Sequence, residues 1–252
     1  GLLFCAVMWR TGKVNKTNNN AWIGRSIARL EDPALLRGGA RFADDLATPA
    51  NVCHAAFMRS PIAHGKIVAL DTAAARAMPG VVAIITGAEM LAHSAPFITG
   101  VKVAAPQYAL ATDRVRYVGE PVAMVLAHDR YRAEDALEAI NVEYAPLTPV
   151  LDAMAALEGL VLHPDTNSNV LHERHFSYGD PEGVFAAAAH VVAGTYHYPR
   201  NSCTPLECFC VIADYDPGED AFEVTANFQG PYTLHTVMSR SLKVPGNRLR
   251  LK

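Results

Sequence analysis

The sequence FEVTANFQGPY, residues 222–232, decides the fold of the last third of the chain. Its first five residues alternate as in a β-strand, and VIADYD (211–216) gives a second strand pattern just upstream. Residues 216–220, DPGED, are typical of a tight turn, so the two strands are predicted to be neighbours. After Pro231, apolar residues recur at helical spacing, which predicts a helix.

The passage from strand to helix contains an amide, a glycine and a proline, Gln229-Gly230-Pro231. Such a passage can direct a polar side chain and free backbone N–H groups at a ligand. Gln229 and Gly230 are therefore candidate binding residues. The alternative is a turn without a ligand, which is the commoner case, and the residues alone leave both open.

Bulk properties restrict the function. The chain has 252 residues, half of them hydrophobic and 19% charged, which is typical of a globular protein. A net charge of -3 and the lack of a basic stripe argue against nucleic-acid binding. No apolar run approaches the roughly 20 residues of a membrane span, and the apolar stretch 2–9 lacks the preceding positive charges of a signal peptide. A cytoplasmic protein is expected, with its five cysteines reduced and mostly buried.

The first two-thirds of the chain alternate between strand and helix patterns. Residues 1–20 are aperiodic and are interpreted as a cloning remnant, a misassigned start or a flexible arm. Strands are predicted at 52–59, 66–70, 81–86, 122–127 and 141–144, and helices at 32–37, 72–78 and 129–140, with a loop at 93–107. The continuous apolar runs VVAIIT (81–86) and VAMVLA (122–127) predict buried strands. Together these elements predict a compact α/β domain.

A second domain is predicted after a linker. Residues 170–178 and 190–198 have strand patterns, with a short helix from about Pro181 to Ala189 between them. A further strand begins at Leu249. Because this set of elements cannot complete a core, the chain is interpreted as the N-terminal piece of a longer protein.

Several separate motifs carry a family resemblance. They are RSPIAHGKI (59–67), Asp71, MPGV (78–81), TGAE (86–89), VRYVGEPVA (115–123) and VEYAPL (142–147). In this order they resemble the xanthine dehydrogenase and aldehyde oxidase family, and most closely the molybdenum-binding large subunit of the carbon monoxide dehydrogenase type. The resemblance covers roughly residues 23–252.

The resemblance implies an α+β (mixed α/β) chain. Residues 1–37 would be an N-terminal arm and lead-in, 38–149 an α/β hammerhead domain, 150–168 a linker, and 169–252 the beginning of a molybdopterin-binding domain. The implied reaction of the full protein is oxidative hydroxylation of an aldehyde, N-heterocycle or similar substrate with oxygen from water. The implied cofactor is molybdenum–molybdopterin cytosine dinucleotide or a related molybdopterin. FAD-binding medium and 2Fe-2S small subunits would be its partners, in a dimer of heterotrimers.

The resemblance assigns roles to single residues. Gln229 matches the family's glutamine that hydrogen-bonds a molybdenum oxo ligand, and Gly230 follows it. Pro205-Leu206-Glu207 matches a family motif, and its strand context favours a structural rather than a catalytic carboxylate. The family's GGxFG loop and catalytic Glu are expected downstream of Lys252, so no catalytic residue is assigned and the chain alone is expected to be inactive.

Other candidate sites favour structural readings. Cys203, Cys208 and Cys210 with His190 and His197 lack the spacing of zinc or iron–sulfur ligands, so core thiols are favoured over a metal site. His64 is expected to order a turn rather than to catalyse. The alternative to an enzyme is a scaffold or assembly protein that keeps the hammerhead fold as an interaction surface.

Overall fold

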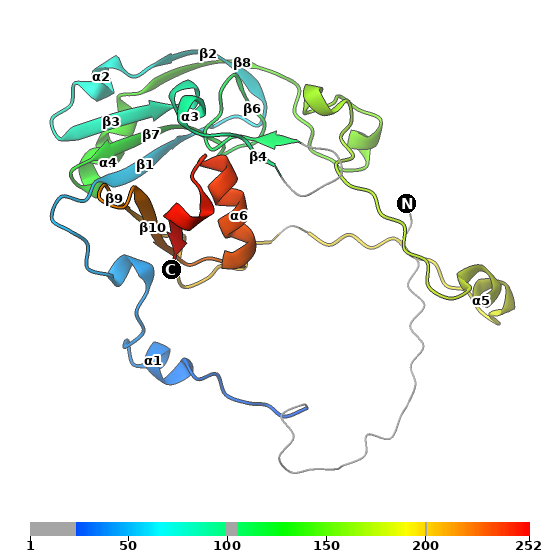
Figure 1. The fold of residues 1–252 in the computed structure, drawn as a ribbon. Helices are drawn as coiled ribbons and strands as arrows, with labels where there is room; N and C mark the ends of the chain where they lie inside the picture. Colours follow the sequence, from blue (N-terminus) through cyan, green and yellow to red (C-terminus); the bar gives the residue numbers. More distant parts are fainter. Residues whose placement is uncertain (1–23, 99–104, 200) are drawn as a thin grey trace. The chain divides into compact units, whose positions relative to one another are not determined.

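The computed structural model describes residues 24–98, 105–199 and 201–252 (Figure 1). By their contacts these residues form two compact units, each made of two stretches of sequence. One unit comprises the chain up to Asp45 together with His175–Cys208, and the other comprises Leu46–Arg174 and Phe209–Lys252. The arm predicted at residues 1–20 lies outside the described residues.

The first unit contains short helices and irregular segments. Helix α1 (Asp32–Leu36) has Glu31 at its N-cap position without a side-chain cap, and Gly38, at a φ of 68°, follows its end. A 3-10 turn, η1 (Ala43–Asp45), comes next. Helix α5 (Pro181–Ala187) begins at Asp180, whose side chain accepts a hydrogen bond from the Gly183 N–H.

The strands predicted at 170–178 and 190–198 are wrong. Every described residue in these two segments lies outside helices and strands, and most are exposed. A strand pattern stabilises a strand only when a neighbouring strand supplies ladder hydrogen bonds and cross-strand contacts. Within the described residues neither segment has such a partner, so the period-2 pattern alone misled the prediction.

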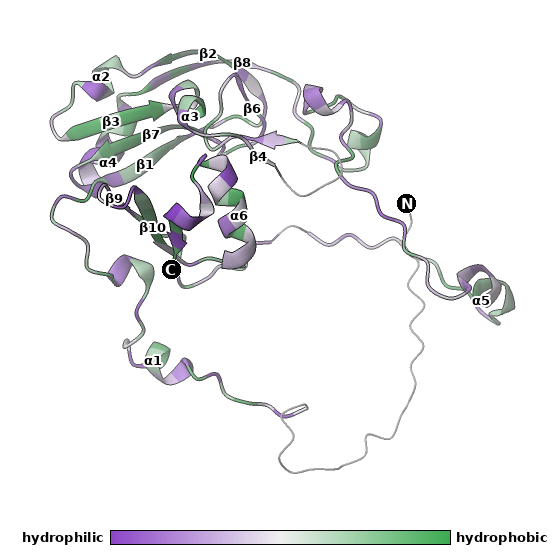
Figure 2. Ribbon diagram, in the orientation of Figure 1, coloured by the Kyte–Doolittle hydropathy of each residue, from purple (hydrophilic) through white to green (hydrophobic). Residues whose placement is uncertain are grey.

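The second unit is built first on an antiparallel sheet, in the order β1 (His54–Arg59), β7 (Pro121–Ala127), β3 (Val81–Thr86). Helix α4 (Arg130–Glu138) packs on this sheet (Figure 1), and the Asp129 side chain caps it by accepting from the Arg132 N–H at 2.9 Å. The core between them includes Ile84, Val125, Ala133, Ala136 and Ile140. Figure 2 shows the corresponding apolar colouring along β3 and β7.

Strand β3 is less buried than its apolar run predicts. A β-bulge lies between Val81 and Ala83, so Val82 has no partner on β7 and is 51% exposed. Beyond the bulge Ile84 lies opposite Val125 with 2% of its surface exposed, while Ile85 and Thr86 are half-buried. Since the sheet is antiparallel, only one face of β3 packs on the core.

A second sheet has the order β6 (Arg114–Val115), β2 (Gly65–Asp71), β8 (Asn141–Pro146). A small core of Ala111, Val115 and Val122 packs with side chains of β2 and β8. Helices α2 (Ala73–Arg76) and α3 (Gly87–His93) flank β3 in the chain. The loop predicted at 93–107 contains a short ribbon, β4 (Phe97–Ile98) paired with β5 (Pro106–Gln107), so this prediction is partly wrong.

The third sheet confirms the predicted hairpin. Strands β9 (Val211–Asp216) and β10 (Ala221–Ala226) are antiparallel, and β11 (Leu249–Leu251) lies parallel to β10 on its other side. Helix α6 (Pro231–Ser241) and the 3-10 turn η4 (Gly246–Arg248) connect β10 to β11. Two further 3-10 turns, η2 (Ala155–Leu157) and η3 (Pro164–Thr166), lie in the segment predicted as a linker.

The prediction that the cysteines are mostly buried is wrong. Cys53, Cys203 and Cys208 are exposed and Cys210 is half-buried, whereas Cys5 lies outside the described residues. No strand forms at 203–210, and the exposure of Cys203 and Cys208 argues against the core thiols that were favoured there. In the described part of the chain, no three His, Cys, Asp or Glu side chains are grouped to hold a metal ion. None of the described helices is long and apolar enough to cross a membrane.

Candidate functional site

The sequence-predicted site residues lie together where β10 ends and α6 begins. Gln229 and Gly230 are both exposed. Gly230 has a φ of 68° and a ψ of 57°, the left-handed region that glycine enters without steric cost. A Cβ built on Gly230 would meet no atom within 4 Å, so open space lies beside it. Pro231 then occupies the first turn, where its missing N–H costs no helical hydrogen bond.

Helix α6 begins without a side-chain cap. The first N–H groups of a helix have no partner within the helix, and they give its N-terminus a partial positive charge. Here these donors lie close to Gln229 in the chain, because only Gly230 separates it from Pro231, the first residue of the helix. The arrangement therefore offers neutral donors at one exposed place.

Side-chain hydrogen bonds fix the position of α6. His235 Nε2 lies 3.1 Å from the carbonyl oxygen of Gly246 and 2.9 Å from that of Leu249. The Ser239 hydroxyl donates to the Val244 carbonyl at 2.6 Å. The Ala95 N–H donates to the Ser241 carbonyl at 2.7 Å, which ties the end of the helix to the segment before β4. Contacts at the middle and the end of α6 thus fix the position of the helix, and with it the place where the helix begins.

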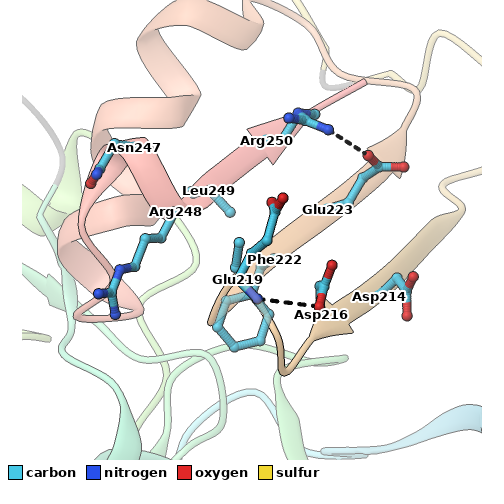
Figure 3. Close-up of a pocket in the computed structure, with 10 residues that line it drawn as sticks. Asp214, Asp216, Glu219, Phe222, Glu223, Asn247, Arg248, Leu249 and Arg250 are labelled. Atoms are coloured by element: carbon cyan, nitrogen blue, oxygen red, sulfur yellow. Dashed lines mark hydrogen bonds and ion pairs between the residues drawn. The ribbon is translucent and has the colours of Figure 1, made fainter.

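The sheet that precedes the passage has a charged face (Figure 3). Asp214 lies opposite Glu223 in the β9–β10 register, a like-charge pair that destabilises unless it is offset. Glu223 is offset by two cations, with Lys252 Nζ at 2.6 Å and Arg250 Nη1 at 3.4 Å. The hydrogen bond from Lys252 is the main cause that lowers the pKa of Glu223.

A hollow of about 180 Å³ lies on this face, lined by residues that include Asp214, Asp216, Glu219 and Arg250 (Figure 3). At the turn end of the sheet, Arg248 pairs with Asp220, which also accepts from the Tyr215 hydroxyl and so raises the pKa of Tyr215. These groups are exposed, and exposed ion pairs contribute little stability. We interpret the face as a solvated charge ladder and place no chemistry on it.

Glu207 is not part of the Gln229 passage. It belongs to the first unit, whereas Gln229 belongs to the second. Its Oε1 accepts a hydrogen bond from the Ala43 N–H at 2.8 Å, which is a structural use of the carboxylate. The strand context predicted for Glu207 is wrong, because residues 206–207 form a bend.

His64 also has a structural hydrogen bond. It is buried, and its Nδ1 lies 2.7 Å from the Thr148 carbonyl oxygen. The Leu147 N–H donates to the His64 carbonyl at 2.9 Å, so the histidine orders the chain directly after β8. A structural role was predicted for His64, but the segment that it orders follows β8 and is not the turn that contains the histidine.

Sequence patterns predicted no role for Arg116. Its guanidinium nonetheless contains a buried nitrogen that has no hydrogen-bond partner within the described residues. Arg116 Nε is buried without a hydrogen-bond partner, as are His64 Nε2 and the Tyr144 hydroxyl. No local pattern marks such an atom, because its surroundings come from distant segments. The VRYVGEP motif around Arg116 was the available signal.

Comparison with known proteins gives two family matches. Residues 37–148 match the model of the aldehyde oxidase and xanthine dehydrogenase a/b hammerhead domain. Residues 162–252 match the model of a molybdopterin cofactor-binding domain. The two models together span most of the chain in the order in which the motifs occur.

Curated relatives and solved structures agree with these matches. The chain is 36% identical to the 6-hydroxypseudooxynicotine dehydrogenase complex subunit gamma of Paenarthrobacter nicotinovorans, over 93% of the chain and 30% of that protein. It is 34% identical to the carbon monoxide dehydrogenase large chain of Hydrogenophaga pseudoflava, over 88% and 29%. It superposes on quinoline 2-oxidoreductase from Pseudomonas putida 86 with a TM-score of 0.80 at 32% identity, covering 91% of the chain and 30% of that structure. The chain thus spans about 30% of the length of these relatives.

Proposed function

The chain belongs to the xanthine dehydrogenase and aldehyde oxidase family, and from this premise we propose that it is the cofactor-contacting start of a molybdenum hydroxylase large subunit. The complete protein would insert an oxygen from water into a C–H bond of an aldehyde, N-heterocycle or similar small molecule. The balance is R–H plus water giving R–OH, two protons and two electrons. The electrons would pass to iron–sulfur and flavin groups on partner subunits.

The described residues fit a molybdopterin at the Gln229 passage. The exposed Gln229 amide, the open space beside Gly230 and the uncapped first turn of α6 provide donors without a side chain in the way. When bound, the molybdenum cofactor would supply the two-electron redox chemistry. The Gln229 amide would hold the metal centre's oxo ligand by a hydrogen bond, and because it is neutral it would orient that ligand without adding charge.

The finer assignments belong to this proposal. The cofactor would be the cytosine dinucleotide form or a related molybdopterin. Partners would be an FAD-binding medium subunit and a 2Fe-2S small subunit, in a dimer of heterotrimers in the cytoplasm. The names of the relatives, which include a dehydrogenase complex subunit and large chains or subunits, support a multisubunit assembly.

The observation that carries the proposal is the exposed Gln229 amide beside the uncapped helix. The test is Gln229→Ala in the molybdenum-loaded complex, with Gln107→Ala, another exposed amide on β5, as the matched control. Loss of one hydrogen bond to a charged group predicts a turnover about 10- to 100-fold lower. The Mo(V) paramagnetic resonance spectrum should change while the molybdenum content stays the same, and the Gln107 variant should match the wild type.

Two results would count against the proposal. One is a Gln229 variant with wild-type turnover and an unchanged Mo(V) spectrum. The other is molybdenum-dependent dye reduction by the 252-residue chain alone, since the family's glycine-rich loop and catalytic Glu are not among its residues.

A further inference from the structure

A polar hollow of about 270 Å³ lies in the second unit, away from the Gln229 passage. It is formed by the segment leading into and beyond β6 and by the turn η3. Its polar lining side chains are Tyr108, Thr112, Asp113, Arg114, Arg116 and Asp165. The volume is close to the lower end of small-molecule sites, which suits a compact ligand.

Arg116 is the unusual member of this lining. Among the described residues its buried Nε has no hydrogen-bond partner, and its one side-chain hydrogen bond there is a long one of 3.5 Å from Nη1 to the Arg114 carbonyl. A guanidinium carries five N–H donors and is always charged. A buried charged donor without a partner costs more than a neutral one. Nε itself is buried, but Arg116 as a whole is only half-buried and lines the hollow, so the rest of its guanidinium can meet a ligand that enters there.

The neighbouring charges leave Arg116 as the available cation. Arg114 is already paired with Asp113, with Arg114 Nε 2.9 Å from Asp113 Oδ2. Glu120 accepts from the Arg116 backbone N–H, and burial raises the pKa of this carboxyl. No ion pair to the Arg116 guanidinium forms within the described residues. Its charge favours the ionised forms of Asp113 and Glu120 without a direct ion pair to either, so its N–H groups remain available to a ligand in the hollow.

His163, next to η3, adds no positive charge near neutral pH. Burial, and then the positive charge of Arg116, lower the pKa of this imidazole. The charged lining then consists of Arg114 and Arg116 against Asp113 and Asp165, two charges of each sign. Because these charges balance, a second negative charge on the ligand gains no net attraction from the lining, while it raises the cost of removing the ligand from water, so a monoanion is favoured over a dianion.

We propose that this hollow binds a carboxylate monoanion, with the Arg116 guanidinium as its ion-pair partner. A carboxylate fits because its two oxygens match the planar N–H fork of an arginine. The Tyr108 and Thr112 hydroxyls are further donors in the lining. The carboxylate has two possible sources, a free carboxylic acid or an Asp or Glu side chain of another polypeptide segment. This inference is independent of the cofactor role of Gln229.

The test is a titration of the 15N-labelled chain, followed at the arginine Nε–Hε resonances by NMR. One arm uses acetate, and the other uses N-acetyl-aspartate N-methylamide as a model of a protein side chain. Saturable shifts of the Arg116 resonance in either arm support the site, and the tighter probe identifies the source. Inorganic phosphate at a pH where it is a dianion should bind more weakly than the better carboxylate.

Substitutions make the test specific. Arg116→Gln should weaken carboxylate binding by about 10- to 100-fold, the effect of losing a charged hydrogen-bond partner. Arg76→Gln is the matched control, because Arg76 is an exposed arginine paired with Glu89 on other elements. If the Arg116 variant is unfolded by circular dichroism, Asp165→Asn replaces it and should tighten acetate binding.

The proposal is overturned if neither carboxylate shifts the Arg116 resonance. It is also overturned if a folded Arg116→Gln chain binds as the wild type does, or if phosphate binds more tightly than both carboxylates. Weaker or unchanged acetate binding in Asp165→Asn would contradict the charge argument in the same way.

Discussion

Replacing Ile84 by alanine tests the packing between β3, β7 and α4. Ile84 is 2% exposed and lies opposite Val125, which is fully buried. The change removes three carbon atoms, worth about 0.8 kcal/mol each in transfer free energy, or roughly 2.4 kcal/mol. The cavity left behind adds a further term, so the expected loss is about 3–4 kcal/mol, within the usual range for Ile→Ala.

The matched control is Val82→Ala on the same strand. Val82 is the unpaired residue of the β-bulge and is 51% exposed, so its truncation should cost less than about 1 kcal/mol. The two variants differ in burial but share strand and side-chain class. A larger loss of stability in Ile84→Ala than in Val82→Ala would therefore show that the Ile84 face of β3 is the packed one.

The assay is hydrogen exchange read by mass spectrometry on peptides that cover β3 and β7. It measures the local opening free energy, so it does not assume that both units unfold in one step. The Ile84 variant should accelerate exchange in both strands, and urea unfolding should give the same order of stability. The reasoning fails if Ile84→Ala and Val82→Ala lower the opening free energy by equal amounts.

Two further changes probe the helix that follows β3. In Gly87→Ala, the new Cβ would lie 2.1 Å from the Ala111 carbonyl oxygen, so we expect a loss of about 1–3 kcal/mol by urea unfolding. Gly39→Ala, where the nearest atom is at 3.8 Å, should be nearly neutral, and equal effects would contradict the clash. The hydrogen bond from the Thr86 N–H is the main cause that lowers the pKa of Glu89. The ionised carboxylate therefore stabilises the fold at neutral pH, and this stabilisation is lost as the pH falls below 4.5 through the folded-state pKa. Glu89→Gln should therefore lower the thermal midpoint at pH 7 but not below that folded-state pKa, and a pH-independent difference would argue against the ionised capping box.

Elements with strong local signals were predicted well from the sequence. Helix α4 combines a capping Asp129 with an apolar stripe, and the structure has both. The hairpin of β9 and β10 and the start of α6 follow from turn residues and from Gly230-Pro231, which constrain the backbone directly. The binding role of Gln229 stays a prediction, which rests on these residues and on the family motif.

Features that depend on distant partners were not predicted. The bulge at Val82 arises from pairing with β7, so an apolar run could not reveal that this residue is exposed. The patterns at 170–178 and 190–198 favour strands, but strand formation requires a neighbour that the local sequence does not specify. The hollow at Arg116 combines residues from two separate segments, and its chemistry follows from an atom that lacks a partner.

The hydrogen bond from Ala95 to Ser241 has a consequence for the order of folding during synthesis. It joins two segments of the second unit that leave the ribosome far apart in time. At about 5–20 residues per second, the delay is on the order of ten seconds. Contacts of this sequence separation slow folding, because a long loop has to close before they stabilise the structure. In a nascent chain the Ala95 N–H therefore has to bond to water until α6 has been synthesised and docks on this segment.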